Sequence, residues 1–207
     1  MGRRLAVAIL MVAVVGVCVW AGIFNYKKRQ AEMQAAQQKQ ATLVKQSSND
    51  GADDVIPDMG GTNMRGKAAP AFTLPELGGK KLSLAEFKGK PVVVNFWGTY
   101  CLPCKVEMPW FEEFSKKYAG QNLVVLGLDD EDGVSKSDVQ KAAEKIGVTY
   151  PILISNDQVA KDYGLGDYLP VTFYINKQGE VVEQTTGTPS KDAMEANIKK
   201  ILTPSGM

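Results

Sequence analysis

Residues 91–109 read PVVVNFWGTYCLPCKVEMP and join an apolar run, a close cysteine pair and the beginning of a helical pattern. The run from Pro91 to Trp97 has the character of a strand buried on both faces of a sheet. A helix is expected from about Cys101 to Tyr118, with Pro109 inside it as a kink. The cysteine pair therefore stands where a buried strand passes into a helix.

This position favours the thiolate form of Cys101. The unpaired backbone N–H groups and the positive end of the helix dipole face a side chain at a helix start. Cysteines in such places have pKa values of roughly 3.5 to 7.5 instead of about 8.5. Cys104 lies one helical turn further on and can attack a mixed disulfide formed at Cys101. Cys101 is thus the predicted nucleophile and Cys104 the resolving thiol of a redox disulfide.

A structural disulfide and half of a zinc site are the alternatives for a C-x-x-C pair. The 207 residues contain three cysteines, Cys18 besides this pair, and no histidine. Without histidine there are no Cys–His dyads and no histidine-containing metal sites, and a cysteine zinc site needs a second pair. No metal is therefore expected. A bridge between Cys101 and Cys104 closes only a small loop and stabilises little through chain entropy. The strand–CxxC–helix context favours redox chemistry.

The N-terminus predicts a membrane anchor. Residues Leu5 to Phe24 are apolar without a charge, and these 20 positions span about 30 Å as a helix, the hydrocarbon thickness of a bilayer. Residues 1–26 are accordingly expected to form a single transmembrane helix. A cleaved signal peptide is the alternative, although the apolar run is long for one. Val17 precedes Cys18 where lipidation wants a small residue, so Cys18 is interpreted as apolar filler in the span.

Residues 27–67 are expected to form a stalk and a flexible linker. Residues 27–41 are rich in helix formers without an apolar stripe, which fits a solvated helical stalk or a disordered tether. Residues 42–67 are rich in Ser, Asn, Asp and Gly and would reach on the order of 25 to 30 Å. Residues 68–207 remain for one globular domain.

Beyond residue 68, short strands and helices alternate. Before the cysteine segment we expect a hairpin at Phe72–Leu77 and Lys81–Leu84 and a turn at Ala85–Gly89. After it we expect a strand at Asn122–Asp129, an amphipathic helix at Ser135–Ile146, a strand at Pro151–Ile154 and a helix at Gln158–Tyr163. The last elements expected are a hairpin at Val171–Asn176 and Glu180–Thr186 and a helix from Ser190 to about Leu202. The pattern predicts a β-α-β unit followed by a β-hairpin and a closing helix. The net charge of +1 leaves no basic footprint for nucleic acid.

The segment from Phe96 to Pro109 resembles the active site of the TlpA/ResA group of the thioredoxin superfamily, which comprises membrane-tethered reductases linked to cytochrome c maturation. The likeness covers roughly residues 68–203. It includes the N-terminal hairpin, a helical insertion after the second buried strand, and the sequence LPVTF at residues 169–173, which resembles the family's cis-proline loop. The resemblance implies an α/β thioredoxin-like fold, with a central mixed sheet flanked by helices and preceded by one transmembrane helix.

The resemblance also assigns substrate-binding roles. Pro170 would be a cis-proline beside the disulfide that leaves the backbone of Leu169 free to pair with an extended substrate. An ordinary trans-proline opening an edge strand is the alternative. Trp97 is placed with these substrate-binding residues because it is expected under the active site. A plain core tryptophan is equally compatible with the sequence.

Glu107 is the third candidate catalytic residue. It falls three residues after Cys104, where ResA-like proteins carry a glutamate that influences the active-site thiols. Stabilisation by the helix dipole without any catalytic duty is an equally good interpretation. Asn95 stands where thioredoxin proper has a buried aspartate, which puts a thioredoxin-like proton relay in doubt and strengthens the case for Glu107.

The function implied is a dithiol reductase without a cofactor, held at the cell membrane by a single span with its domain outside the cytoplasm. It would reduce apocytochrome c or another secreted protein and be recharged by a membrane thiol reductant. A peroxiredoxin-like thiol peroxidase is one alternative, but Gly98 occupies the threonine position of the T-x-x-C motif and Thr99 is one place off. A copper-delivery module is the other, since thiolates suit Cu(I). Related copper proteins add a histidine, which is absent here.

Overall fold

The computed structural model describes residues 61–203. The predicted anchor at residues 1–26, Cys18, the stalk and most of the linker lie outside the described residues. Between residues 61 and 203, none of the helices has both the length and the apolar character needed to cross a bilayer.

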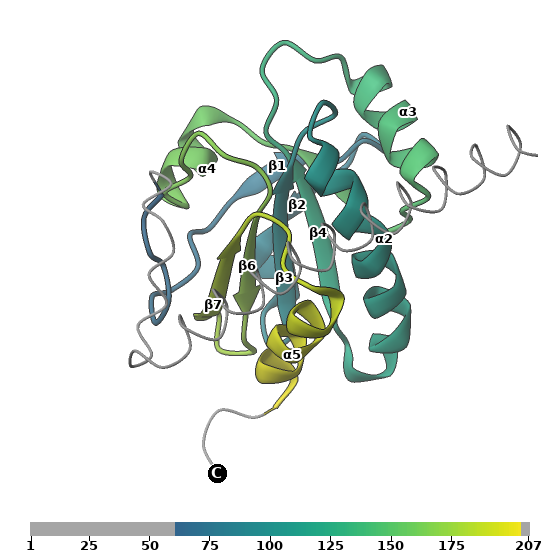
Figure 1. The fold of residues 1–207 in the computed structure, drawn as a ribbon. Helices are drawn as coiled ribbons and strands as arrows, with labels where there is room; N and C mark the ends of the chain where they lie inside the picture. The colour runs from purple at the N-terminus through teal and green to yellow at the C-terminus, as the bar shows by residue number, and fades with distance from the viewer. Residues whose placement is uncertain (1–60, 204–207) are drawn as a thin grey trace, which may run out of the picture. The chain divides into compact units, whose positions relative to one another are not determined.

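The described chain forms seven strands, four α-helices and two short 3-10 helices (Figure 1). In chain order they are β1 (Thr73–Pro75), β2 (Lys81–Ser83), η1 (Leu84–Phe87), β3 (Val92–Trp97), α2 (Leu102–Lys117), η2 (Ala119–Gln121), β4 (Val124–Asp129), α3 (Lys136–Ile146), β5 (Ile152–Ile154), α4 (Asp157–Asp162), β6 (Val171–Ile175), β7 (Val181–Thr186) and α5 (Lys191–Leu202). Each helix and strand predicted beyond residue 68 is present; most are shorter than predicted, and α4 lies one residue earlier. The turn predicted after β2 is the 3-10 helix η1.

Five strands form one mixed sheet in the order β5-β4-β3-β6-β7. Strands β3, β4 and β5 are parallel, whereas β6 runs antiparallel to β3 and β7 antiparallel to β6. Strands β1 and β2 form a separate antiparallel hairpin, as predicted. Helix α3 lies between β4 and β5 and corresponds to the predicted helical insertion. The thioredoxin-like α/β arrangement expected from the sequence is confirmed.

Strand β3 is the centre of the core because all six of its residues are buried. Val93 and Trp97 face one apolar cluster, which also takes residues from α2, α3 and α5. Val94 and Phe96 face a second cluster, which takes residues from β1 and α4. Alternation of side chains across a sheet covered on both faces explains the continuous apolar run from Pro91 to Trp97.

The domain begins earlier than the predicted boundary at residue 68. The backbone N–H of Gly66 donates to the C=O of Val181 at 2.8 Å, and the side chain of Met64 is buried. Residues 62–67, assigned from composition to the linker, therefore pack against β7. Composition could not separate them from a linker because their partners lie more than a hundred positions away in the sequence.

Candidate active site

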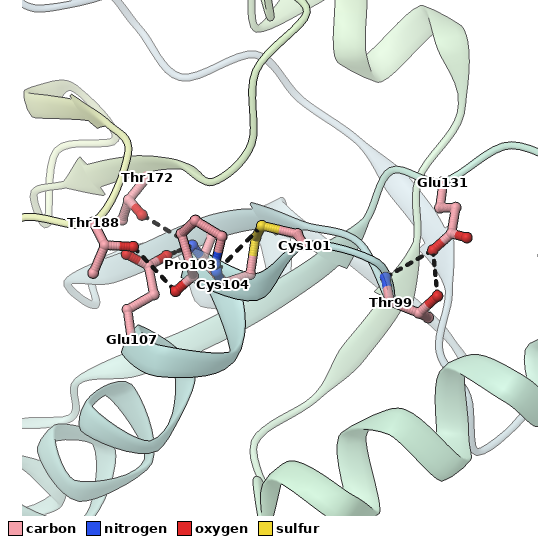
Figure 2. The surroundings of a disulfide bond; sticks show 9 residues. Thr99, Cys101, Pro103, Cys104, Glu107, Glu131, Thr172 and Thr188 are labelled. Atoms are coloured by element: carbon pink, nitrogen blue, oxygen red, sulfur yellow. Dashed lines mark hydrogen bonds between the residues drawn. A yellow bond between two sulfur atoms is a disulfide. The ribbon is translucent and has the colours of Figure 1, made fainter.

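The two cysteines lie at the junction of β3 and α2, where the sequence predicts a redox pair. Cys101 is the N-cap residue of α2, and Pro103 stands in the first turn. The Sγ atoms of Cys101 and Cys104 are joined in a disulfide. The backbone N–H of Cys104 also lies 3.2 Å from the Cys101 sulfur, as Figure 2 shows. A helix N–H group thus points at the very sulfur that would carry the thiolate charge.

The two sulfurs differ in access. Cys101 retains 5% of its surface, whereas Cys104 retains none. A partner molecule can therefore reach Cys101 but not Cys104. This difference supports the predicted order of events, with Cys101 attacking first and Cys104 resolving from the interior.

The Leu169–Pro170 peptide bond is cis, as predicted. Pro170 is buried, and its C=O accepts a hydrogen bond from the N–H of Gly187 at 2.8 Å. Leu169 is half-buried and reaches the loop before Cys101, since a Cβ added to Gly98 would lie 3.4 Å from its Cδ1. Within residues 61–203, the backbone N–H and C=O of Leu169 have no hydrogen-bond partner. Both backbone groups of Leu169 are therefore available for the predicted pairing with a substrate backbone.

Trp97 does not offer a substrate contact. Its side chain is fully buried in the cluster that also contains Cys101 and Cys104. A Cβ on Gly127 would lie 3.4 Å from the Trp97 Nε1, so the backbone of β4 packs in van der Waals contact with the ring. The prediction of a direct substrate-binding role for Trp97 is corrected: the ring is a core side chain in the same buried cluster as the two cysteines.

Glu107 is fully buried on the same face of α2 as Cys104, one turn along. The Nδ2 of Asn95 donates to the Glu107 Oε1 at 2.7 Å and to the Thr172 Oγ1 at 3.0 Å. Asn95, at the position where thioredoxin proper has an aspartate, is thus a buried neutral amide that holds the carboxyl of Glu107. The sequence predicted the importance of both positions but not their hydrogen bond.

Burial raises the pKa of Glu107 to about 8, although hydrogen bonds from Asn95 and Thr188 act in the opposite direction. The carboxyl is therefore largely protonated at neutral pH. A dipole-stabilised surface carboxylate would instead be ionised there. Glu107 is therefore not an ionised surface carboxylate at a helix start, and its catalytic role stays a prediction.

Two further acidic residues near the site were missed by the sequence analysis. The backbone N–H and the hydroxyl of Thr99 both donate to the Oε2 of Glu131, at 2.7 and 2.6 Å (Figure 2). Asp129, at the end of β4, is buried, and burial together with the charges of Glu131 and Asp130 raises its pKa to about 7. The acidic run that ends a strand parallel to β3 was the available signal, because such strands end at one edge of the sheet.

Thr188 is the third residue that the sequence analysis missed. Its Oγ1 donates to the C=O of Pro103 at 3.1 Å, so the segment after β7 is tied to the first turn of α2 (Figure 2). No sequence spacing indicates this contact, because the two residues lie 85 positions apart.

Exposed apolar side chains flank the cysteine pair. Four large hydrophobic side chains are the exposed ones among the described residues: Tyr100 at 65%, Leu102 at 72%, Val106 at 53% and Tyr168 at 54%. The first three flank the cysteines in sequence, and Tyr168 precedes Leu169. Exposed apolar groups gathered at one place mark an interaction surface. Across residues 61–203, no three Cys, His, Asp or Glu side chains gather as metal ligands.

A solvent-accessible cysteine at a helix start, its buried partner and a neighbouring cis-proline in a mixed sheet define the class: thioredoxin-like thiol:disulfide oxidoreductases. The chain belongs to the AhpC/TSA family, whose model matches residues 65–184. It is a thiol-disulfide oxidoreductase of the ResA/DsbE-like kind with a Cys101–Cys104 pair, and protein disulfides are the substrates that this class implies.

Known relatives agree with this assignment. The chain is 41% identical over 138 residues to the thiol-disulfide oxidoreductase ResA of Bacillus thuringiensis (strain Al Hakam), covering 66% of this chain and 78% of the relative. It is 42% identical over 137 residues to ResA of Geobacillus kaustophilus (strain HTA426), covering 66% and 77%. A thiol:disulfide interchange protein of the thioredoxin family from Chlorobium tepidum TLS superposes with a TM-score of 0.60 at 26% identity, covering 69% of this chain and all of that one. The resemblance to the TlpA/ResA group is confirmed.

Proposed function

We propose that the protein reduces disulfide bonds of proteins outside the cytoplasm while residues 1–26 hold it at the membrane. The observation that carries the direction of attack is the difference in access between Cys101, which retains 5% of its surface, and Cys104, which retains none. The unpaired backbone of Leu169 and the apolar surface beside it suit an extended protein segment that presents a disulfide.

Reduction takes two exchange steps. The Cys101 thiolate attacks one sulfur of the substrate disulfide, forms a mixed disulfide and releases the other substrate sulfur as a thiolate. Cys104 then loses its proton and attacks the Cys101 sulfur, which releases the second substrate thiol. The substrate gains two electrons and two protons, and the enzyme is left with the Cys101–Cys104 disulfide. A membrane thiol reductant restores the dithiol by the same two steps in reverse.

Glu107 supplies the proton transfer for the second step. Its carboxyl lies on the Cys104 face of α2, and a pKa of about 8 lets it exchange a proton near neutral pH. In its ionised form it accepts the Cys104 proton as the mixed disulfide resolves. In its protonated form it returns a proton to Cys104 when the reductant opens the disulfide. Asn95 keeps the carboxyl oriented toward this task.

Apocytochrome c is the substrate that we propose. This choice follows from the sequence likeness to the TlpA/ResA group, whose members are linked to cytochrome c maturation. A haem-binding C-x-x-C-H segment oxidised to a disulfide presents closely spaced sulfurs on a short extended chain. Such a segment fits a site with one accessible sulfur beside an unpaired backbone.

The test uses the reduced full-length chain in detergent micelles, mixed with an oxidised C-x-x-C-H peptide and, separately, with hydroxyethyl disulfide. Thiol content of the enzyme is followed by alkylation and mass spectrometry. Transfer of two electrons to the peptide, faster than to the small disulfide, is expected. Failure of the reduced protein to exchange with the peptide, whether or not it exchanges with the small disulfide, would overturn the proposal.

The location outside the cytoplasm has its own test. Intact cells expressing the chain are treated with a mild reductant and then with a membrane-impermeant maleimide. Labelling of Cys101 in unbroken cells is expected, with a cytoplasmic thiol protein as the unlabelled control. Labelling that appears only after lysis would contradict the proposed orientation.

A further inference from the structure

Residues 62–67 form a segment, here called the strap, that runs beside β7. The backbone N–H of Gly66 donates to the Val181 C=O at 2.8 Å, and the Val181 N–H donates to the Lys67 C=O at 2.9 Å. The backbone N–H of Met64 donates to the Oε1 of Gln184 at 2.9 Å. The strap therefore pairs with the outer strand of the sheet along most of its length.

Side chains reinforce this attachment. Met64 retains only 8% of its surface, and the guanidinium of Arg65 pairs with Glu183. The Arg65 Nη2 also donates to the C=O of Gln184 at 2.9 Å. An apolar anchor, an ion pair and main-chain bonds together show that the strap has one defined position on β7.

The far end of the strap touches a different element. The Thr62 N–H donates to the C=O of Gly164 at 2.7 Å. Gly164 has a φ of +62°, and a Cβ on it would lie 2.4 Å from the Cβ of Thr62. A Cβ on Gly61 would in turn lie 3.2 Å from the Gly164 oxygen. The two main chains approach so closely that glycine is required at residue 164 for both conformation and space.

Gly164 begins the segment that ends at the cis bond beside the disulfide, residues 164–170. At its start, the Gly164 N–H donates to the Lys161 C=O and the Leu165 N–H to the Ala160 C=O. At its end, the Pro170 C=O accepts from Gly187. Between residues 61 and 203, no further backbone hydrogen bond restrains residues 166–169. Besides the packing of Leu165 and Leu169 against the core, the bond from Thr62 is one of few hydrogen bonds that fix where this loop lies.

We propose that the strap is a positioning element for substrate recognition, acting through the loop at residues 164–170. This inference rests on the proposed pairing of Leu169 with a substrate backbone. No strap residue belongs to the site built around the disulfide, so the strap controls how well an extended substrate is aligned and leaves the chemistry at Cys101 unchanged. The strap, with which the chain enters the domain, is thus a determinant of substrate specificity.

The experiment compares Thr62→Pro, which removes the donor to Gly164, with Thr62→Ala, which keeps it. Both are made in the full-length chain in detergent micelles. Reduction is measured with an oxidised ten-residue peptide and with hydroxyethyl disulfide, which is too small to use the loop. Thr62→Pro is expected to raise KM for the peptide about fivefold, the usual effect of one lost hydrogen bond, with kcat within twofold. Thr62→Ala is expected to match the wild type.

The small disulfide distinguishes recognition from damage to the fold. Its exchange rate is expected to be unchanged in both variants, and Gly164→Ala, which forces the strap away, is expected to reproduce the rise in KM. An unchanged KM in Thr62→Pro, or equal loss with both disulfides, would overturn the strap's role. A wild-type protein that exchanges with hydroxyethyl disulfide but not with the peptide would instead overturn the proposed function on which it rests.

Discussion

The two sulfurs of the disulfide face two different environments. On the inner side lie Cys104 and Glu107, both fully buried, with the amide of Asn95 bonded to the carboxyl. On the outer side lie Cys101 and exposed apolar side chains such as Leu102. In the mechanism that we propose, the polar groups of the inner side handle protons and the outer side is the surface that a substrate protein covers. Recognition and proton transfer are then separated across a single S–S bond.

The separation has a physical reason. A carboxyl with a raised pKa needs burial, because desolvation disfavours its ionised form. A docking surface needs exposure, because only accessible apolar area can be covered by a partner. One face of a helix start cannot be both buried and exposed. The turn of α2 between Cys101 and Cys104 places the buried carboxyl and the exposed surface on opposite sides.

Exchanging the two cysteines for serine tests the comparison with the largest expected effect. Cys101→Ser removes the accessible nucleophile, so reduction of the C-x-x-C-H peptide is expected to fall roughly a thousandfold or more. Cys104→Ser keeps the first step and loses the second, so a mixed disulfide at Cys101 is expected to accumulate, visible by mass spectrometry. If the mixed disulfide accumulated in Cys101→Ser instead, Cys104 would be the first nucleophile and the proposed assignment of the two sides would be wrong.

Glu107→Gln tests the inner side. The amide keeps the shape but cannot take the Cys104 proton, so resolution of the mixed disulfide at pH 8 is expected to slow roughly tenfold or more. Attack by Cys101 on hydroxyethyl disulfide is expected to change little. Stopped-flow measurement of the two steps separates them. Glu113→Gln, on the exposed face of the same helix, is the control and should leave both steps at the wild-type rate.

The same variant changes the dependence of stability on pH. The folded pKa of Glu107, about 8, lies above its ordinary value of 4.5, so its contribution to stability is complete below about pH 4.5 and is lost as pH rises through about 8. The loss is on the order of a few kcal/mol. Chemical denaturation at several pH values should show this decline in the wild type and a smaller one in Glu107→Gln. The residual decline belongs to Asp129 and Asp130, whose pKa values burial also raises. Equal slopes in the two proteins would count against a buried, protonated carboxyl.

Leu102→Ser and Tyr168→Ser test the outer side. Each removes an exposed apolar group that a bound peptide would cover, so KM for the oxidised peptide is expected to rise about threefold to tenfold. The rate with hydroxyethyl disulfide should be unaffected. Gln178→Ser, in the turn between β6 and β7, serves as the control. If both surface variants matched this control, the apolar surface would have no part in recognition.

The smallest effect is expected from Glu131→Gln, which keeps a hydrogen-bond acceptor for Thr99 but removes a charge. Because that charge helps to raise the pKa of Asp129, the Asp129 titration is expected to move from about 7 toward its ordinary value. Thr99→Val, which keeps the charge and loses the hydroxyl donor, should cost about 1 kcal/mol in the free energy of unfolding. Carboxyl NMR measures the Asp129 titration in Glu131→Gln, and chemical denaturation measures the stability of Thr99→Val. An unchanged Asp129 titration in Glu131→Gln would remove the proposed electrostatic link.

Local patterns predicted the parts of the site that lie on one segment. The apolar run of β3, the cysteines after it and the helix that follows are contiguous, so sequence spacing placed Cys101 and Cys104 correctly. The cis geometry of the Leu169–Pro170 bond followed from family likeness, which carries information that spacing alone does not.

Contacts between distant segments could not be predicted. The hydrogen bond of Asn95 to Glu107 depends on how α2 lies over the sheet, and the strap depends on β7 partners such as Gln184, 120 positions from Met64. Trp97 shows a different limit. An aromatic side chain beside a catalytic cysteine fits a surface or a core equally well, and only the packing around Gly127 decides for the core.

The ionisation of the Glu107 carboxyl tests the account most directly. The carboxyl carbon of Glu107 is followed by NMR in the oxidised protein labelled with ¹³C-glutamate, and its signal is assigned by its absence in Glu107→Gln. A titration midpoint of about 8 is the predicted result. A midpoint near 4.5, the ordinary value, would show an ionised carboxyl at neutral pH and contradict the division of labour between the two sides of the disulfide.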